Sequence, residues 1–303
     1  VAEADESDQS FLMLQPSVSI ITNIEEDHLI NYGNDFENLR QAFLTFVKKL
    51  PFDGLLIACG DDPEIKKLLP HFSRPNVTYG FEETNDYVIS NYEPSEFRSN
   101  FLLTYESQSI HINFNMLGRH NALNACAATV LAIEEGINVS IIQSALKNFM
   151  GINRRMQVIG NIKIQNSNSI LVDDYGHHPS EIRNTIESIR ESHPEKKLTM
   201  VFQPHRYSRT KDLFEEFVAV LQLVDQLILL DVYPAGEDLI KNYESKDLLE
   251  RLQSSTLKVC LSEESKINMP IEESLEKEEG ILLMQGAGSI SQISESIKKS
   301  YSI

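Results

Sequence analysis

Two carboxylates, a phenol and two imidazoles stand together in residues 173–179, whose sequence is DDYGHHP. The segment follows the apolar run 169–172, which is typical of a buried strand. In an open α/β sheet, residues just past the carboxyl end of a strand are the ones that meet a ligand. This spacing therefore predicts a ligand-binding loop, although a solvated turn is the simpler alternative.

A second segment of the same kind is PHRYSRT, residues 204–210, which follows the apolar run 197–202. His205, Arg206 and Arg209 suit a carboxylate or a phosphoryl group, because guanidinium groups donate paired hydrogen bonds to such anions. A plain basic loop is the alternative, but solubility does not require one in a chain with a formal net charge of −18. Two consecutive strands that end in such loops predict one shared crevice.

Three further sets of residues suggest binding chemistry, and each has a simpler reading. Glu3 and His28 suit a divalent cation that substrate oxygens also hold, although Glu3 taken alone is more typical of a solvated acid. Asn121 and Asn124 share one face of a predicted helix start, where capping explains Asn121 but not Asn124. The pair 154–155, two arginines, suits a phosphate clamp or a solvated pair.

The elements that must position these residues suggest two α/β domains. The length of 303 residues is that of about two domains, and we place the boundary so that the domains are 1–150 and 151–303. Strands and helices alternate regularly in the second domain, which predicts a mostly parallel sheet covered on both faces. Residues 77–114 instead predict an antiparallel stretch attached to the first domain.

Composition narrows the function classes. The charge of −18 argues against nucleic acid or an anionic membrane surface as a partner, since either needs a basic face. Cys59, Cys126 and Cys260 form no CxxC pair, which argues against a disulfide framework or a zinc site and is compatible with the reducing cytoplasm. Residues 286–289, GAGS, predict a tight strand-to-helix turn more than an anion-binding loop. A GxxxxGK[ST] phosphate loop is absent from these residues.

Taken together, seven motifs in this order resemble the Mur ligase family. They are EADESD at 3–8, TNIEEDH at 22–28, HNALNA at 120–125, RR at 154–155, DDYGHHP at 173–179, PHRYSRT at 204–210 and QGAGS at 285–289. Met156 departs from the phenylalanine usual in the family. The resemblance implies an α/β fold in which 1–150 is an incomplete central ATPase domain and 151–303 a Rossmann-like domain. It also implies that a UDP-binding domain and the phosphate loop would precede Val1.

The resemblance further implies an activity with ATP and Mg²⁺ as cofactors. This activity joins L-alanine to the carboxylate of UDP-N-acetylmuramate through an acyl phosphate, in cytoplasmic peptidoglycan precursor synthesis. Glu3 and His28 would hold magnesium. Contacts to nucleotide would come from Asn121, Asn124, Arg155, Asp174 and Tyr175. The L-alanine carboxylate and the reacting end of the muramate would be positioned by His177, His205, Arg206 and Arg209.

Alternatives remain at this point. The chain by itself is expected to be inactive or nearly so. A related ligase that recycles murein peptides is a second reading, and a non-catalytic binding module with the same fold is a third. A metallohydrolase is the weakest, because the sequence has no HxxxH pair. The resemblance leaves the oligomeric state open between a monomer and a homodimer.

Overall fold

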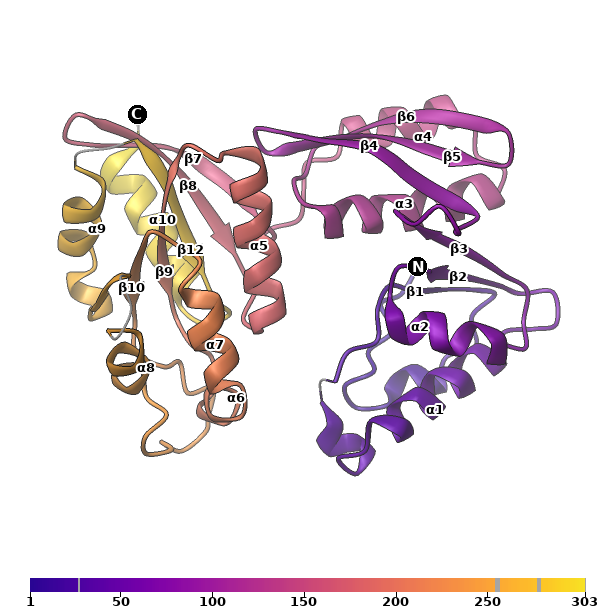
Figure 1. The fold of residues 1–303 in the computed structure, drawn as a ribbon, viewed down its shortest axis with the longest axis horizontal. Helices are drawn as coiled ribbons and strands as arrows, with labels where there is room; N and C mark the ends of the chain where they lie inside the picture. Colours follow the sequence, from indigo (N-terminus) through magenta and orange to yellow (C-terminus); the bar gives the residue numbers. More distant parts are fainter. Residues whose placement is uncertain (27, 254–256, 277–278, 303) are drawn as a thin grey trace. The chain divides into compact units, whose positions relative to one another are not determined.

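The computed structural model describes residues 1–26, 28–253, 257–276 and 279–302. The chain divides into two compact units, which are described separately (Figure 1). Unit 1 comprises residues 1–115 and 119–149, and unit 2 comprises residues 116–118 and 150–303. Among the described helices, none is long and apolar enough to cross a membrane.

The sheet of unit 1 combines a parallel part with an antiparallel part. In sheet order its strands are β1 Val18–Ile21, β2 Leu55–Cys59, β3 Asn76–Gly80, β4 Tyr87–Ser95, β5 Arg98–Tyr105 and β6 Gln108–Phe114. Strands β1 to β4 pair in parallel, and β4, β5 and β6 form an antiparallel meander. The predicted antiparallel stretch is therefore confirmed for β4 to β6 and wrong for β3, which pairs in parallel with both of its neighbours.

Three helices of unit 1 begin directly after an Asp or Asn whose side chain caps the helix. The helices of unit 1 are α1 Phe36–Lys48, α2 Pro63–Leu68, α3 Arg119–Glu134 and α4 Val139–Lys147, with short 3₁₀ turns η1 Ser10–Met13, η2 Leu29–Tyr32 and η3 Leu69–His71. The Asp62 carboxylate accepts hydrogen bonds from two backbone N–H groups of α2, with Pro63 in its first turn. The rings of Phe43 and Phe46 on α1 pack against Phe11, with centroids 5.4 and 5.0 Å away, and so secure the N-terminal segment.

The sheet of unit 2 is parallel except at one edge. Its strands are β7 Gln157–Ile164, β8 Ser167–Asp174, β9 Lys197–Phe202, β10 Gln226–Leu229, β11 Lys258–Leu261 and β12 Gly280–Gln285, in the order β11-β10-β9-β12-β8-β7. Among the strand pairs of this sheet that the described residues form, only β7–β8 is antiparallel. The mostly parallel sheet was predicted, whereas β7 was not. The last strand of the chain, β12, lies between β8 and β9.

Helices cover both faces of this sheet, as predicted (Figure 1). They are α5 Pro179–Ser192, α6 Tyr207–Asp212, α7 Phe214–Leu221, α8 Ser245–Leu252, α9 Asn268–Leu275 and α10 Ile290–Tyr301, with the 3₁₀ turn η4 Glu264–Lys266. On one face, Leu171 and Leu282 join a buried cluster with α9 and α10. On the other, Phe202 packs on Phe217 of α7 at 5.7 Å. Helix α6 begins at Tyr207, inside the PHRYSRT segment.

Candidate functional site

The predicted ligand loops of unit 2 lie at one edge of its sheet. Strand β12 pairs in parallel with both β8 and β9, so that Gln285 is opposite Asp174 on one side and Phe202 on the other. Parallel strands end at the same edge, and the loops after β8, β9 and β12 therefore start side by side. The site residues that the structure brings together here are Arg155, Asp174, Tyr175, His177, His205, Arg206 and Arg209.

Asp174 is a buried hydrogen-bonding centre at this edge, with 5% of the residue exposed. Its Oδ2 accepts from the backbone N–H of Met156 at 2.7 Å. Its Oδ1 accepts from the Gly176 N–H at 2.9 Å, from Nε2 of Gln285 at 2.7 Å and from the Thr185 hydroxyl at 3.3 Å. The carboxylate thus fixes the start of the loop after β8. Its predicted contact with nucleotide stays a prediction, and such a contact would compete with these bonds.

Arg154 links the entry into unit 2 to both β8 and β12. Its guanidinium donates to the Gly286 carbonyl oxygen at 2.6 Å and lies 3.5 Å from Oδ1 of Asp173. Burial raises the pKa of Asp173, and the charge of Arg154 opposes that rise. The same guanidinium lies 4.8 Å from the centroid of the Tyr175 ring, a cation–π distance. Arg154 therefore supports this edge of the sheet.

Glu181 places an internal anion at the start of α5. Its carboxylate accepts from the backbone N–H groups of His177 at 2.9 Å and His178 at 3.2 Å, and from Nη1 of Arg155 at 3.0 Å. Burial opposes ionisation of Glu181, but these donors outweigh it and lower its pKa to about 2. Arg155 also lies 5.7 Å from the centroid of the Tyr175 ring and is exposed, as a predicted ligand contact requires.

Four rings form a continuous row along the edge, which we call the ring row: Tyr175, His177, His205 and Tyr233. The first two meet edge to face with centroids 5.3 Å apart. The two imidazoles are 5.6 Å apart. His205 and Tyr233 stack at 5.5 Å with an interplanar angle of 8°. The predicted histidines of two separate loops thus come into contact.

Positive charge surrounds the two imidazoles of the ring row. Nη1 of Arg209 lies 3.4 Å from Nδ1 of His205. Burial first, and then the charge of Arg209, lower the pKa of His177. Burial, followed by the charges of His177 and of Arg209 and Arg206, lowers the pKa of His205 to about 4. Both shifts favour the neutral form of the two rings.

The loop at 230–244, between β10 and α8, contributes residues that the sequence analysis missed. Irregular loops of this length are uncommon and are usually functional. The backbone carbonyl of Tyr233 accepts from the backbone N–H of Arg206, and the backbone N–H of Tyr233 donates to the Pro204 carbonyl, both at 2.8 Å. This backbone pairing holds the Tyr233 ring against His205. The signal that could have found Tyr233 was an aromatic residue in a long loop after a strand.

The same loop fixes the start of α6. The Glu237 carboxylate accepts from the backbone N–H of Ser208 at 3.0 Å and from its hydroxyl at 2.7 Å. Arg206, just before the helix, is exposed and has a backbone φ of 73°, which is unusual for a residue other than glycine. Arg209 lies on α6 and not in a loop as predicted, because the helix begins at Tyr207.

The GAGS segment is a tight strand-to-helix turn, as interpreted from the sequence. It joins β12 to α10, which begins at Ile290. Gly286 has a φ of 143°, and a Cβ atom there would lie 2.7 Å from the Gln203 carbonyl oxygen. A Cβ atom on Gly288 would meet the Tyr233 ring at 2.7 Å. Glycine is therefore required by close approach of the backbone.

In unit 1, the two predicted asparagines lie near the start of α3. Because α3 begins at Arg119, Asn121 is inside the first turn and does not cap the helix, so the capping alternative is wrong. Asn121 is buried, with 7% exposed, while Asn124 is exposed one turn later. Beside them, the Arg119 guanidinium stacks over the Phe81 ring at 3.8 Å. The contact of Asn121 and Asn124 with nucleotide stays a prediction.

The two predicted metal ligands lie in segments of unit 1 that contact each other. Glu3 is exposed and precedes the first turn, and His28 is partly buried just before η2. Nδ2 of Asn31 donates to the Ser7 carbonyl at 2.6 Å, which joins the two segments. Among the described residues, no three His, Cys, Asp or Glu side chains gather into a metal-binding group. Mg²⁺ needs only one or two protein carboxylates, because it retains water and phosphate ligands.

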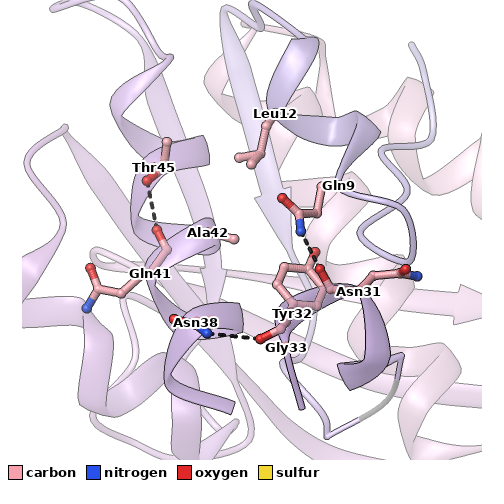
Figure 2. Close-up of a pocket in the computed structure, with 9 residues that line it drawn as sticks. All are labelled: Gln9, Leu12, Asn31, Tyr32, Gly33, Asn38, Gln41, Ala42 and Thr45. Carbon is pink, nitrogen blue, oxygen red and sulfur yellow. Dashed lines mark hydrogen bonds between the residues drawn. The ribbon is translucent and has the colours of Figure 1, made fainter. Parts of the chain in front are cut away.

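A cavity of about 380 Å³ lies between α1, η1 and η2 of unit 1 and contains none of the predicted site residues (Figure 2). Its wall includes amides whose NH₂ groups bond to the protein: Asn38 donates to the Tyr32 carbonyl at 2.9 Å, and Gln9 to the Asn31 carbonyl. These bonds join the N-terminal segment to η2, and η2 to α1. The lining residues are Gln9, Leu12, Asn31, Tyr32, Gly33, Asn38, Gln41, Ala42 and Thr45.

Comparison with known families identifies the class of protein that carries this fold and site. A model of the Mur ligase middle domain matches residues 2–132, and one of the Mur ligase glutamate ligase domain matches residues 154–288. The chain therefore belongs to the Mur ligase family, and the resemblance seen in its motifs is confirmed. Its α/β fold with two mostly parallel sheets is the fold of these two domains.

Individual relatives point to one branch of that family. The chain is 47% identical to a UDP-N-acetylmuramate–L-alanine ligase of Baumannia cicadellinicola, over 98% of the chain and 62% of the relative. The crystal structure of UDP-N-acetylmuramate-alanine ligase from Thermotoga maritima matches with a TM-score of 0.79 and 27% identity, over 98% of this chain and 62% of that one. The MurF ligase of Thermotoga maritima in complex with ADP shares the fold at 17% identity, with a TM-score of 0.70 and coverage of 94% and 63%. The chain thus spans about 62% of the length of the first two relatives.

Proposed function

We propose that the chain is part of an ATP-dependent ligase that joins L-alanine to the carboxylate of UDP-N-acetylmuramate in peptidoglycan precursor synthesis. The observation that carries the proposal is the ring row, in which His177 and His205 meet beside Arg209. A small zwitterion needs a cation for its carboxylate and a neutral acceptor for its ammonium group, and this edge offers both. The names of the two alanine-adding relatives described above support the substrate pair.

The remaining site residues fit the nucleotide side of such a reaction. Arg155 is exposed next to Tyr175, where a guanidinium can pair with phosphate oxygens while the ring offers a stacking face. In unit 1, Asn121 and Asn124 present amides at the start of α3. A relative of the same fold is described in complex with ADP, which supports nucleotide binding in this family.

Magnesium fits the residues predicted to hold it. Glu3 offers an exposed carboxylate, and His28 an imidazole in the adjoining segment. Bound Mg²⁺ would neutralise charge on the transferring phosphoryl group. The residues of the chain would bind and orient the reactants, a contribution that can lower a barrier by about 7–11 kcal/mol. The reaction itself would pass through an acyl phosphate of the muramate carboxylate, which the amine of L-alanine attacks.

Binding of L-alanine to the 303-residue chain tests the amino-acid site directly. We expect L-alanine to shift the imidazole NMR signals of His177 and His205, and D-alanine and L-glutamate to do so much less. Equal shifts with all three, or none with L-alanine, would contradict the proposed substrate. An ATP hydrolysis assay with UDP-N-acetylmuramate tests the separate expectation that this chain alone has little or no turnover, and robust turnover would overturn it.

A further inference from the structure

The hydrogen-bond partner of His177 fixes which of its ring nitrogens carries the proton. Nδ1 lies 3.3 Å from the backbone carbonyl oxygen of Tyr175. A carbonyl oxygen can only accept, so Nδ1–H is the donor. In the neutral ring, Nε2 then has a free lone pair. His177 is therefore a neutral imidazole that accepts at Nε2.

The partner of His205 fixes the opposite arrangement. Its Nδ1 lies 3.4 Å from Nη1 of Arg209. A guanidinium group can only donate, so Nδ1 of His205 accepts, and the ring proton is on Nε2. The two neighbouring imidazoles, with centroids 5.6 Å apart, thus hold opposite tautomers. His177 offers an acceptor at Nε2, and His205 offers a donor at Nε2.

An amino acid presents the complementary pair of groups. Its ammonium group donates, its carboxylate accepts, and a single carbon atom separates them. A carboxylate held by Nε2–H of His205 leaves the ammonium group within reach of the adjacent ring, whose centroid is 5.6 Å away. The geometry points to His177 as the catalytic base that takes a proton from the ammonium group of the amino-acid substrate. This inference rests on the proposed ligase function and deepens it, because it assigns separate roles to two histidines that the resemblance treats alike.

The proton transfer is balanced within the site. One N–H bond of the ammonium group breaks, its electron pair stays on nitrogen, and the proton moves to Nε2 of His177. The neutral amine then attacks the activated carboxyl carbon, and phosphate leaves with the electrons of the C–O bond. Nothing is oxidised or reduced.

The charged groups around His177 act in two directions. Arg209 on α6 and Arg155 before β7 lower the pKa of the ring, which keeps it neutral before the substrate binds but opposes the charge that it gains in the transfer. Glu181 on α5, whose Oε2 lies 3.8 Å from Nδ1, stabilises the imidazolium that forms. His205 and Tyr175 complete the surroundings with neutral rings.

A first test needs no turnover. Long-range ¹⁵N–¹H NMR of the 303-residue chain near neutral pH distinguishes the two imidazole tautomers. We expect His177 to be protonated at Nδ1 and His205 at Nε2. L-Alanine should shift the Nε2 resonance of His177 more than its Nδ1 resonance. A ring of His177 protonated at Nε2 would overturn the inference.

A second test introduces His177→Asn into an active ligase that contains this chain. The asparagine NH₂ can replace Nδ1–H as donor to Tyr175, but asparagine is not a base. With L-alanine, kcat at neutral pH should fall by about a hundredfold or more, while KM changes by less than about threefold. The residual rate should rise with pH, as free amine forms in solution. Hydroxylamine is uncharged at neutral pH and needs no base, so hydroxamate formation should persist.

The control is His178→Asn, which changes the neighbouring histidine. His178 caps α5 by accepting from the Ser180 N–H, and asparagine is a favourable cap, so alanine transfer should be unchanged. If His177→Asn lost alanine transfer and hydroxamate formation together, the role of His177 would be structural. That result would overturn its assignment as the catalytic base. If the unmodified protein formed neither product, the proposed ligase function would be wrong, and so would the assignment of His177 as its base.

Discussion

The carboxyl edge of the unit 2 sheet and the acidic N-terminal segment of unit 1 are organised in opposite ways. At the edge, Asp174 is buried and accepts four hydrogen bonds, and four rings lie in contact. In the N-terminal segment, Glu3 is exposed and lies outside regular structure. The predicted amino-acid site is thus arranged before its ligand binds, whereas the predicted metal site offers side chains that the ligand would still have to order.

This difference follows from the chemistry of the two ligands. A small zwitterion binds weakly, so its site gains affinity when the binding groups are held in place beforehand. A divalent cation attracts carboxylates strongly and brings its own water and phosphate ligands. Substitutions in the two regions should therefore have different effects on stability and on ligand binding. At the edge they should cost stability or binding, and in the N-terminal segment they should cost cation binding alone.

Asp174→Asn should have the largest effect on stability. One carboxylate oxygen becomes an NH₂ group that faces donors such as the Met156 N–H, so buried donors lose their acceptor. We expect the free energy of unfolding of unit 2 to fall by about 3 kcal/mol, measured by denaturant titration. Asp212→Asn, at an exposed position, is the matched control. A loss below about 1 kcal/mol would show that the edge is less preorganised than the structure indicates.

Arg209→Met should have the largest effect on amino-acid binding. It removes the charged donor next to His205 and keeps most of the side-chain volume. L-Alanine affinity, measured by NMR titration of the chain, should fall by about fiftyfold. The same change at Arg183, an exposed residue of α5, should leave affinity unchanged. Equal losses in both variants would indicate a diffuse charge effect.

Tyr233→Leu should weaken L-alanine binding by about tenfold, because the ring that stacks on His205 is lost. Tyr233→Phe keeps the stack and should bind as the unmodified chain does. Tyr243→Leu removes a ring from the same loop that contacts Phe214 instead, and it serves as the control. Equal weakening in the Leu variants would place the effect in the loop as a whole.

Glu181→Gln tests the internal anion at α5 and should cost about 1 kcal/mol of unfolding free energy at neutral pH. The pKa of Glu181 is lowered to about 2, below the ordinary value. Its contribution is therefore complete above about pH 4.5 and is lost as pH falls toward 2. Denaturation at several pH values should show a flatter acid profile for the variant. A steeper profile would contradict the assigned direction.

Glu3→Gln should have the smallest effect on stability, within about 0.5 kcal/mol, because the side chain is exposed. Titration with Mg²⁺, followed by the NMR signals of Glu3 and His28, should show binding in the unmodified chain and a loss in the variant. A large destabilisation of unit 1 would contradict the difference between the two regions, because it would show that the N-terminal segment is also preorganised.

The sequence predicted the parallel sheet of unit 2 because its strands are apolar runs separated by helical periodicity. It missed β7, where polar residues and an irregular register near Gly160 obscure the alternation. The two motif loops at the carboxyl edge were also predictable, since the segments DDYGHHP and PHRYSRT each follow an apolar run. The sequence placed them near one another, but it did not show which ones bond to each other.

The missed partners are distant in the chain. Gln285 bonds to Asp174 across 111 residues, and Arg154 bonds to the Gly286 carbonyl across 132. Local patterns such as periodicity and capping do not contain such pairings. Tyr233 was missed for a related reason, because its contact with His205 depends on backbone pairing between two loops. Opposite tautomers of two histidines likewise follow only from their partners in space.

The position of β12 has a consequence for synthesis of the protein. The strand is made after the other five strands of its sheet, yet it separates β8 from β9 and supplies Gln285, which holds the loop after β8. While the ribosome is still translating the preceding helices, the two histidine loops have no common support. Amino-acid recognition should therefore arise abruptly once β12 has been translated, so that chains without this strand cannot capture the substrate.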